Sequence, residues 1–118
     1  MPDPLARSTF QSSVLDRNAS LEPAAQKRLA LVSELLGVRR REIVPRLAGA
    51  AFGEAQVTDN CRLTAHWRMG DGVTLRLLAN LSERNAAHAP GEFKGALIWG
   101  CAPGEIIPPW SVSWRIEP

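Results

Sequence analysis

The sequence predicts an α+β chain that is mainly β: an N-terminal extension and one helix, followed by a small antiparallel β-sandwich of about six or seven strands. Apolar residues recur at helical spacing between residues 23 and 41, and after residue 50 they alternate with polar residues. Short alternating runs separated by turn residues are typical of an antiparallel sandwich or a partly open barrel. We expect an extended leading segment (1–22), a helical segment (23–47) and a β-domain (48–118).

Composition excludes several classes of function. The chain has 118 residues, of which 45% are hydrophobic, and its 14 Lys and Arg against 12 Asp and Glu give a net charge of only +2. Nucleic-acid binding usually needs a stronger and more clustered positive charge, so we expect no nucleic-acid partner. No apolar run approaches the ~20 residues of a membrane helix, and no signal peptide is recognisable at the N-terminus. We therefore expect a cytoplasmic protein with no membrane partner.

Cysteine and histidine spacing does not indicate a metal site. Cys61 and Cys101 are too few for a disulfide framework and form no metal-binding motif, so we expect reduced thiols. His66 and His88 could complete a zinc site only if the fold brought all four residues together.

Residues 1–20 contain Pro2, Pro4 and many small polar residues, with apolar positions too isolated for independent folding. This segment is expected to be a loop that lies against something larger. A helix is predicted from Pro23, which suits the first helical turn, to Arg41. The helix should stop before Pro45, because the proline ring disfavours the α conformation at Val44.

The predicted helix has an apolar face and a basic end. Arg39, Arg40 and Arg41 lie in its last turn, where cations complement the helix dipole. A solvated helix end is the favoured interpretation of this run, and a phosphate or nucleic-acid contact is the alternative. Gly37 weakens the helix by roughly 1 kcal/mol relative to alanine. The apolar face comprises Ala25, Leu29, Val32 and Leu36, widened by Leu31 and Leu35.

A hairpin is the clearest β signal. Two alternating runs are joined by Gly70-Asp71-Gly72, residues that tolerate the positive φ of a tight turn. A short strand at 56–58, turned by Asp59-Asn60, is expected to pair beside the hairpin. The inward positions of the two runs are Leu63, Ala65, Trp67 and Met69, then Val73, Leu75, Leu77 and Ala79.

The rest of the chain alternates between loop and strand. A loop is predicted over 82–92, a strand over 95–99, and a connection over 100–109 with 105–107 briefly extended. The closing strand places Trp110, Val112, Trp114 and Ile116 on one face, opposite Ser111, Ser113 and Arg115.

Four stretches spread over nearly the whole chain carry a family resemblance. They are Pro2-Asp3-Pro4 with Thr9-Phe10-Gln11-Ser12-Ser13-Val14-Leu15-Asp16, Leu35 to Leu47, Leu77-Leu78-Ala79-Asn80-Leu81, and Pro108-Pro109-Trp110-Ser111-Val112. In this order they resemble maltooligosyltrehalose trehalohydrolases, a family of α-amylase-type glycoside hydrolases. Arg17 and Gly37-Val38 stand where the family usually has tryptophan and alanine-leucine.

The resemblance implies that 23–47 is the last barrel helix and its exit, and that 48–118 is the C-terminal β-domain. It also implies a parent enzyme that releases trehalose from maltooligosyl trehalose with three carboxylates and no cofactor. Those carboxylates lie on barrel strands that precede this segment in the family. No catalytic, cofactor-binding or metal residue can therefore be assigned here, and the missing catalytic barrel is the expected partner.

The residues themselves also argue against catalysis by this chain alone. Glycoside hydrolysis needs two carboxyl groups roughly 5–9 Å apart on rigid supports, and a (β/α)₈ barrel takes ~250 residues. No nucleophile elbow or glycine-rich phosphate loop is present. The acids fall mostly in predicted turns or on polar helix faces, for example Asp59, Asp71, Glu83, Glu92 and Glu105.

The four tryptophans leave an alternative function open. They could form a sugar-stacking platform, as in a carbohydrate-binding module that recognises α-glucans. Trp67, Trp110 and Trp114 fall on the apolar side of alternating strands, which favours core packing instead, whereas Trp99 follows an apolar run with no clear face. Without its barrel, the helix would expose apolar surface, so self-association of the isolated chain is expected.

Overall fold

The computed structural model describes residues 3–14, 16–58, 61–87, 94–102 and 104–118. The chain divides into two units, Met1–Glu34 and Leu35–Pro118. Each unit is described by itself.

The leading segment contains helical turns, so the expectation of a loop was wrong there. Helix α1 (Arg7–Ser13) and the 3₁₀ turn η1 (Arg17–Leu21) precede α2 (Pro23–Val38). Hydroxyl and carboxylate side chains bond to nearby backbone: Ser13 Oγ donates to Thr9 O (2.8 Å), and Asp16 Oδ1 accepts from Asn18 N (2.9 Å). The Asp16 carboxylate caps η1, whereas the Ser13 hydroxyl only bonds back to a carbonyl of its own helix. Neither turn has a periodic apolar face, which is why the hydrophobic pattern did not predict them.

Helix α2 begins at Pro23 as predicted, but its exit differs from the prediction. The α geometry ends at Val38 and continues as a π turn, η2 (Arg39–Ile43), and a 3₁₀ turn, η3 (Val44–Arg46). Val44 stays in the α region (φ −54°, ψ −43°), so the expected displacement by Pro45 does not occur. Pro45 lies in the first turn of the new 3₁₀ segment, where its missing N–H leaves no hydrogen bond unmade.

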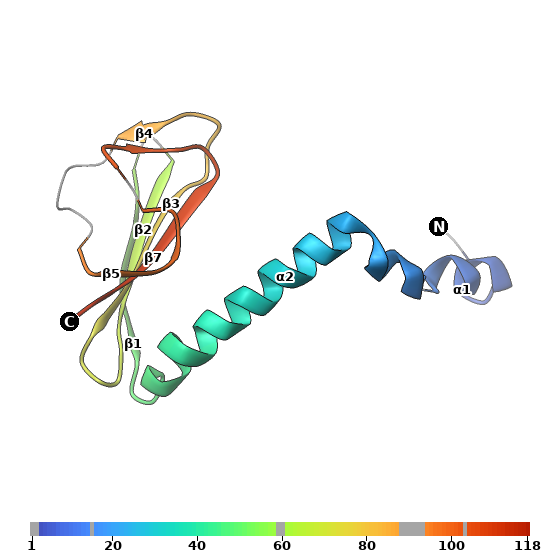
Figure 1. Cartoon of the computed structure of the whole chain (residues 1–118), viewed down its shortest axis with the longest axis horizontal. Helices are drawn as coiled ribbons and strands as arrows, with labels where there is room; N and C mark the ends of the chain where they lie inside the picture. Colours follow the sequence, from blue (N-terminus) through green and yellow to red (C-terminus); the bar gives the residue numbers. More distant parts are fainter. Residues whose placement is uncertain (1–2, 15, 59–60, 88–93, 103) are drawn as a thin grey trace. The chain divides into compact units, whose positions relative to one another are not determined.

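The second unit is an antiparallel β-domain, as predicted. Its main sheet has five strands in the order β1-β2-β3-β7-β5, and β4 and β6 form a separate two-stranded sheet (Figure 1). The fold class predicted from the sequence is confirmed. The strands are β1 (Ala51–Val57), β2 (Arg62–Arg68), β3 (Thr74–Asn80), β4 (Ala86–Ala87), β5 (Ala96–Gly100), β6 (Ile106–Ile107) and β7 (Ser111–Glu117).

Strand positions follow the sequence closely, with two differences. Strand β1 is longer than the 56–58 expected, because it pairs with β2 from Ala51 onward. Strand β4 lies inside the predicted loop over 82–92 and pairs with β6, the short extension expected at 105–107. Asp59 and Asn60 lie outside the described residues.

The predicted β2–β3 hairpin is confirmed. Its last pair is Arg68 with Thr74, and the Met69 N–H donates to Val73 O (2.8 Å) beyond it. The turn joins the helical exit closely: Gly70 N–H donates to Arg46 O (2.8 Å), and a Cβ added at Gly70 would lie 1.6 Å from Ala48 O. Only glycine permits this approach of one backbone to another.

Strand β3 is buried on both faces at its C-terminal end. Leu75 and Ala79 are buried on the face that carries Trp67. On the other face, Leu78 forms a buried cluster with Ala86 of β4 and Ile107 of β6, each 2% exposed. The β4–β6 pair covers the end of the main sheet away from the β2–β3 turn (Figure 1).

Asn80, which is fully buried, ends β3 with a network of hydrogen bonds. Its amide nitrogen lies 2.7, 3.1 and 3.0 Å from the carbonyl oxygens of Arg84, Ile107 and Pro108. Its Oδ1 accepts from the backbone N–H and the hydroxyl of Ser82. Because a side-chain amide has only two N–H donors, these three carbonyls share them.

Replacing Gly70 with alanine should destabilise the second unit by about 1–3 kcal/mol, because the new methyl group would overlap Ala48 O. Chemical denaturation followed by circular dichroism measures the change. Gly104→Ala is the matched control, since a Cβ at Gly104 meets nothing within 4 Å. Equal stability of the two variants would contradict the close approach.

Candidate functional site

The main sheet carries an aromatic cluster on the face next to the helical exit, the segment Arg39–Leu47 that follows α2. Trp67 on β2 and Trp114 on β7 stack across β3, with ring centroids 5.7 Å apart and an interplanar angle of 28°. Phe52 on β1 meets Trp67 edge-on at 6.0 Å. Both geometries are those that aromatic pairs prefer. Both indoles are half-buried, so they pack against apolar neighbours without reaching full burial.

Ile43 of the helical exit lines two small apolar pockets beside this cluster. Their volumes are about 160 and 200 Å³, and Trp114 lines both. Among the described side chains that line them, Arg39 is the charged one and none is a carboxylate. The described lining can hold apolar groups. The first pocket is lined by Ile43, Leu47, Ala50, Trp67, Met69, Leu75 and Trp114, and the second by Leu35, Val38, Arg39, Ile43, Ile98, Trp99 and Trp114.

Trp110 does not pack in the core, so that expectation was wrong. Its side chain is 67% exposed, and the residue adopts φ +51° in the turn before β7. The prediction extended the alternation of β7 one residue too far, although Pro108-Pro109 signalled a turn at this position. The other face of β7 was predicted to face solvent, but Ser113 on that face is only 2% exposed. Ser113 pairs with Leu78, which packs against β4 and β6.

Charged side chains pair with one another across the sheet and its turns. Arg76 binds Glu117 (2.5 Å), and Arg46 binds Asp71 (2.9 Å) and lies 3.6 Å from Glu42. These carboxylates are occupied by arginines in pairs that remain partly exposed, each of which contributes little to stability. The prediction that the chain holds no catalytic residue stays a prediction.

Candidate metal ligands are not gathered in the part of the chain that the structure describes: no group of three His, Cys, Asp or Glu side chains lies there. Cys61 is exposed and Cys101 half-buried, and both are free thiols. His66 lies on β2 beneath the β1 bulge, where a Cβ at Gly53 would approach the imidazole to 2.4 Å. His88 lies outside the described residues.

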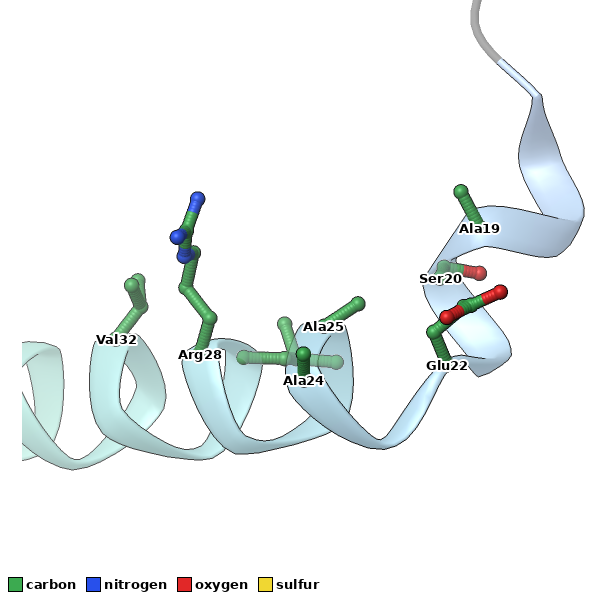
Figure 2. A pocket seen from close by; sticks show the side chains of 8 residues that line it. Ala19, Ser20, Glu22, Ala24, Ala25, Arg28 and Val32 are labelled. Carbon is green, nitrogen blue, oxygen red and sulfur yellow. The ribbon is translucent and has the colours of Figure 1, made fainter.

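An open groove lies beside α2 in the first unit. Its volume is about 620 Å³, and Figure 2 shows Arg28 and Val32 rising from the same side of the helix. Apolar side chains of α2 are exposed along it, with Leu29 58% and Val32 45% accessible. The groove is therefore an unpartnered apolar helix face rather than an enclosed site. Its lining residues are Ala19, Ser20, Glu22, Ala24, Ala25, Arg28, Leu29 and Val32.

Residues 50–114, more than half of the chain, match a protein family described as "Domain of unknown function (DUF3459)". The chain belongs to this family. The matched range contains the strands from β1 to β6 and β7 as far as Trp114. The DUF3459 assignment therefore rests on the β-domain of this chain.

The chain is also similar to a crystal structure described as that of a "Putative alpha Amylase from Salmonella typhimurium". The TM-score is 0.82 at 25% sequence identity, over 99% of this chain and 20% of the other. This chain thus spans about a fifth of the length of that protein. No curated protein sequence matches it.

These similarities confirm the coarser part of the predicted relationship: the chain resembles one domain of an α-amylase-type protein. The finer assignment to trehalohydrolases remains a prediction. Among the described residues, no helix is both long enough and apolar enough to cross a membrane.

Replacing Trp114 with alanine should destabilise the chain by about 2–4 kcal/mol, because it removes the ring stacked on Trp67 and enlarges both pockets. Trp110→Ala should stay within about 0.5 kcal/mol of the original chain, as for other exposed side chains. Thermal or urea denaturation separates the two. Similar losses in both variants would contradict the different burial of these indoles.

Proposed function

We propose that the chain is the non-catalytic C-terminal part of a trehalohydrolase-like glycosidase, in which it caps and stabilises the catalytic barrel. The observation that carries this proposal is the exposed apolar face of α2 in a chain about one fifth as long as a similar α-amylase-type protein. Such a face needs a covering surface, and a catalytic domain in the same protein would supply it.

The exposed side chains on α2 support a protein partner. Leu29, Val32 and Leu36 are 58%, 45% and 55% exposed, and their spacing places them along one side of the helix. Helices derive most of their stability from packing an apolar face, so an uncovered α2 would gain stability from a partner. Because about half of each residue is already covered, burying the rest would contribute roughly 0.7–1.5 kcal/mol for each of the three.

Different observations support the broad enzyme class and the specific trehalohydrolase type. The DUF3459 match and the solved structure support an α-amylase-type parent. The trehalohydrolase type rests on the four sequence stretches. Two of them meet in the structure, because Asn80 of Leu77-Leu78-Ala79-Asn80-Leu81 donates to the carbonyl of Pro108 in Pro108-Pro109-Trp110-Ser111-Val112. Trehalose release from maltooligosyl trehalose is accordingly the activity assigned to the parent and not to this chain.

Fragment complementation tests the proposal. The chain is co-expressed with the catalytic region of a trehalohydrolase that lacks the corresponding C-terminal part. We expect a purifiable complex that releases trehalose from maltooligosyl trehalose, and no release by this chain alone. The double substitution Leu29→Glu with Val32→Glu should abolish the complex, because it places carboxylates on the apolar face.

Lys27→Glu with Ala30→Glu is the matched control, since it adds two carboxylates with the same spacing at exposed positions away from the Leu29–Val32 side of α2 and should leave the complex intact. Failure of the original chain to form any complex would overturn the capping role. Complementation of an α-amylase catalytic region but not of a trehalohydrolase region would overturn only the trehalohydrolase assignment.

Without a catalytic partner, the isolated chain is expected to self-associate through the apolar face of α2. Sedimentation over a concentration series should show a mass that rises above that of the monomer, and the Leu29→Glu, Val32→Glu variant should shift the distribution toward monomer. A clean monomer at high concentration would contradict this expectation.

A further inference from the structure

Strand β1 forms one edge of the main sheet and is open to solvent along its whole length. Among the described strands, it pairs with β2 on one side and with none on the other. All seven of its residues, Ala51–Val57, are exposed. Phe52 is 62% exposed and Val57 is 74% exposed. The backbone groups on the outer side of β1 are therefore available to pair with another strand.

The two edges of the main sheet differ in how well they are protected against such pairing. Lysine, proline and short or irregular strands are common protective features of sheet edges. At the other edge, β5 is shorter, has a register shift within it, and has a positive-φ glycine just before it and at its end. Strand β1 contains no proline, lysine or arginine, and its one register shift lies near its start. Its segment Glu54–Val57 is thus a regular and unprotected edge.

The hydrogen bonds to β2 identify which residues of β1 point outward. The N–H of Thr58, just after β1, donates to the carbonyl oxygen of Arg62 at the start of β2 (3.0 Å). Because the backbone groups of an antiparallel strand alternate between its two sides, those of Gln56 also face β2. The N–H and C=O groups of Ala55 and Val57 then face away from β2. An antiparallel partner strand would bond to these outward groups.

The side chains of β1 are complementary to those of a second β1 when a two-fold axis passes at Ala55. In this register Ala55 faces Ala55 of the second copy, and Glu54 faces Gln56 of the second copy in a non-hydrogen-bonded pair, where side chains lie closest. Within the strand, Gln56 Nε2 already donates to Glu54 Oε1 (2.8 Å), so these side chains share one face and can bond to each other. An axis at Glu54 would instead set two carboxylates opposite each other, which is destabilising.

The other face of β1 supports the same register. Phe52 pairs with Trp67 and Val57 pairs with Leu63, which places both side chains on the face of the aromatic cluster. With the axis at Ala55, Val57 of one copy lies beside Phe52 of the other. Pairing would therefore cover the two large apolar side chains that β1 leaves exposed.

We propose that two copies of the chain pair antiparallel through β1 in this register, which joins their five-stranded main sheets into one continuous sheet. A second copy fits this edge because the same residues supply both halves of each contact, as a two-fold interface requires. A stable interface typically buries about 800 Å² on each partner, and a single strand edge offers less. The dimer is therefore expected to be weak and to dissociate on dilution. This proposal does not depend on the enzyme class of the parent.

Sedimentation equilibrium over a concentration series tests the proposal in the Leu29→Glu, Val32→Glu variant, in which association through α2 is removed. We expect a concentration-dependent dimer in this background. Ala55→Lys should weaken the dimer at least about tenfold, because it places two like charges opposite each other at the axis. Gln56→Lys is the matched control: it adds the same charge at the next position, where it faces Glu54 of the second copy, and should keep the dimer. Circular dichroism confirms that each variant is folded, and Ala55→Glu, which also sets like charges at the axis, replaces Ala55→Lys if the latter does not fold.

A monomer at all concentrations in this background, or a dimer that Ala55→Lys leaves unchanged, would overturn the proposal. Equal weakening by Ala55→Lys and Gln56→Lys would show association without the proposed register and would also overturn it. Fragment complementation tests the catalytic region as the other possible occupant of this edge. Ala55→Lys in the original chain should leave the complex with the catalytic region intact, whereas loss of that complex would show that the catalytic region covers β1 and would overturn the dimer.

Discussion

The β-domain depends on strand β3 being covered on both of its faces. On one face, Trp67 and Trp114 reach across β3 from the neighbouring strands and stack on each other. On the other, Leu78 packs with Ala86 and Ile107 of the small second sheet. A single sheet of this size would leave one face in water, and a two-stranded sheet would not be stable alone. Each layer therefore stabilises the other through β3.

Asn80 connects this core to the surface turn before β7. A fully buried amide is tolerated only when its polar atoms are paired, and here the Nδ2 and Oδ1 groups both bond to the loops that flank β4 and β6. The same interactions hold the Pro108 carbonyl and so fix the exposed ring of Trp110. One buried polar residue thus determines both how the second layer docks and how a surface aromatic is presented.

The sequence predicted those parts of the fold where apolar periodicity decides the structure. The β2–β3 hairpin, β5 and the inward positions Ala65, Leu75 and Ala79 follow from alternation and from the Gly70-Asp71-Gly72 turn. Periodicity failed at two places: α1 forms without a periodic apolar face, and a change of helix type keeps Val44 helical before proline. The exposure of Trp110 and the buried network of Asn80 also went unpredicted, because both depend on long-range partners that a local pattern does not contain.

The two units differ in how much of their apolar and polar side-chain surface is packed or paired within the unit. The β-domain has a buried cluster, a satisfied network at Asn80 and arginine–carboxylate pairs within residues 35–118, although Phe52, Val57 and Trp110 are exposed there. The first unit instead exposes Phe10, Leu21, Leu29 and Val32, at 69%, 72%, 58% and 45%, and none of its described residues in α1 is buried. Its short helical turns rest on local hydrogen bonds, each of which contributes only about 0.5–1.5 kcal/mol. A segment of this kind gains most of its stability from a surface outside itself, which supports the proposal that residues 1–34 contact a catalytic domain.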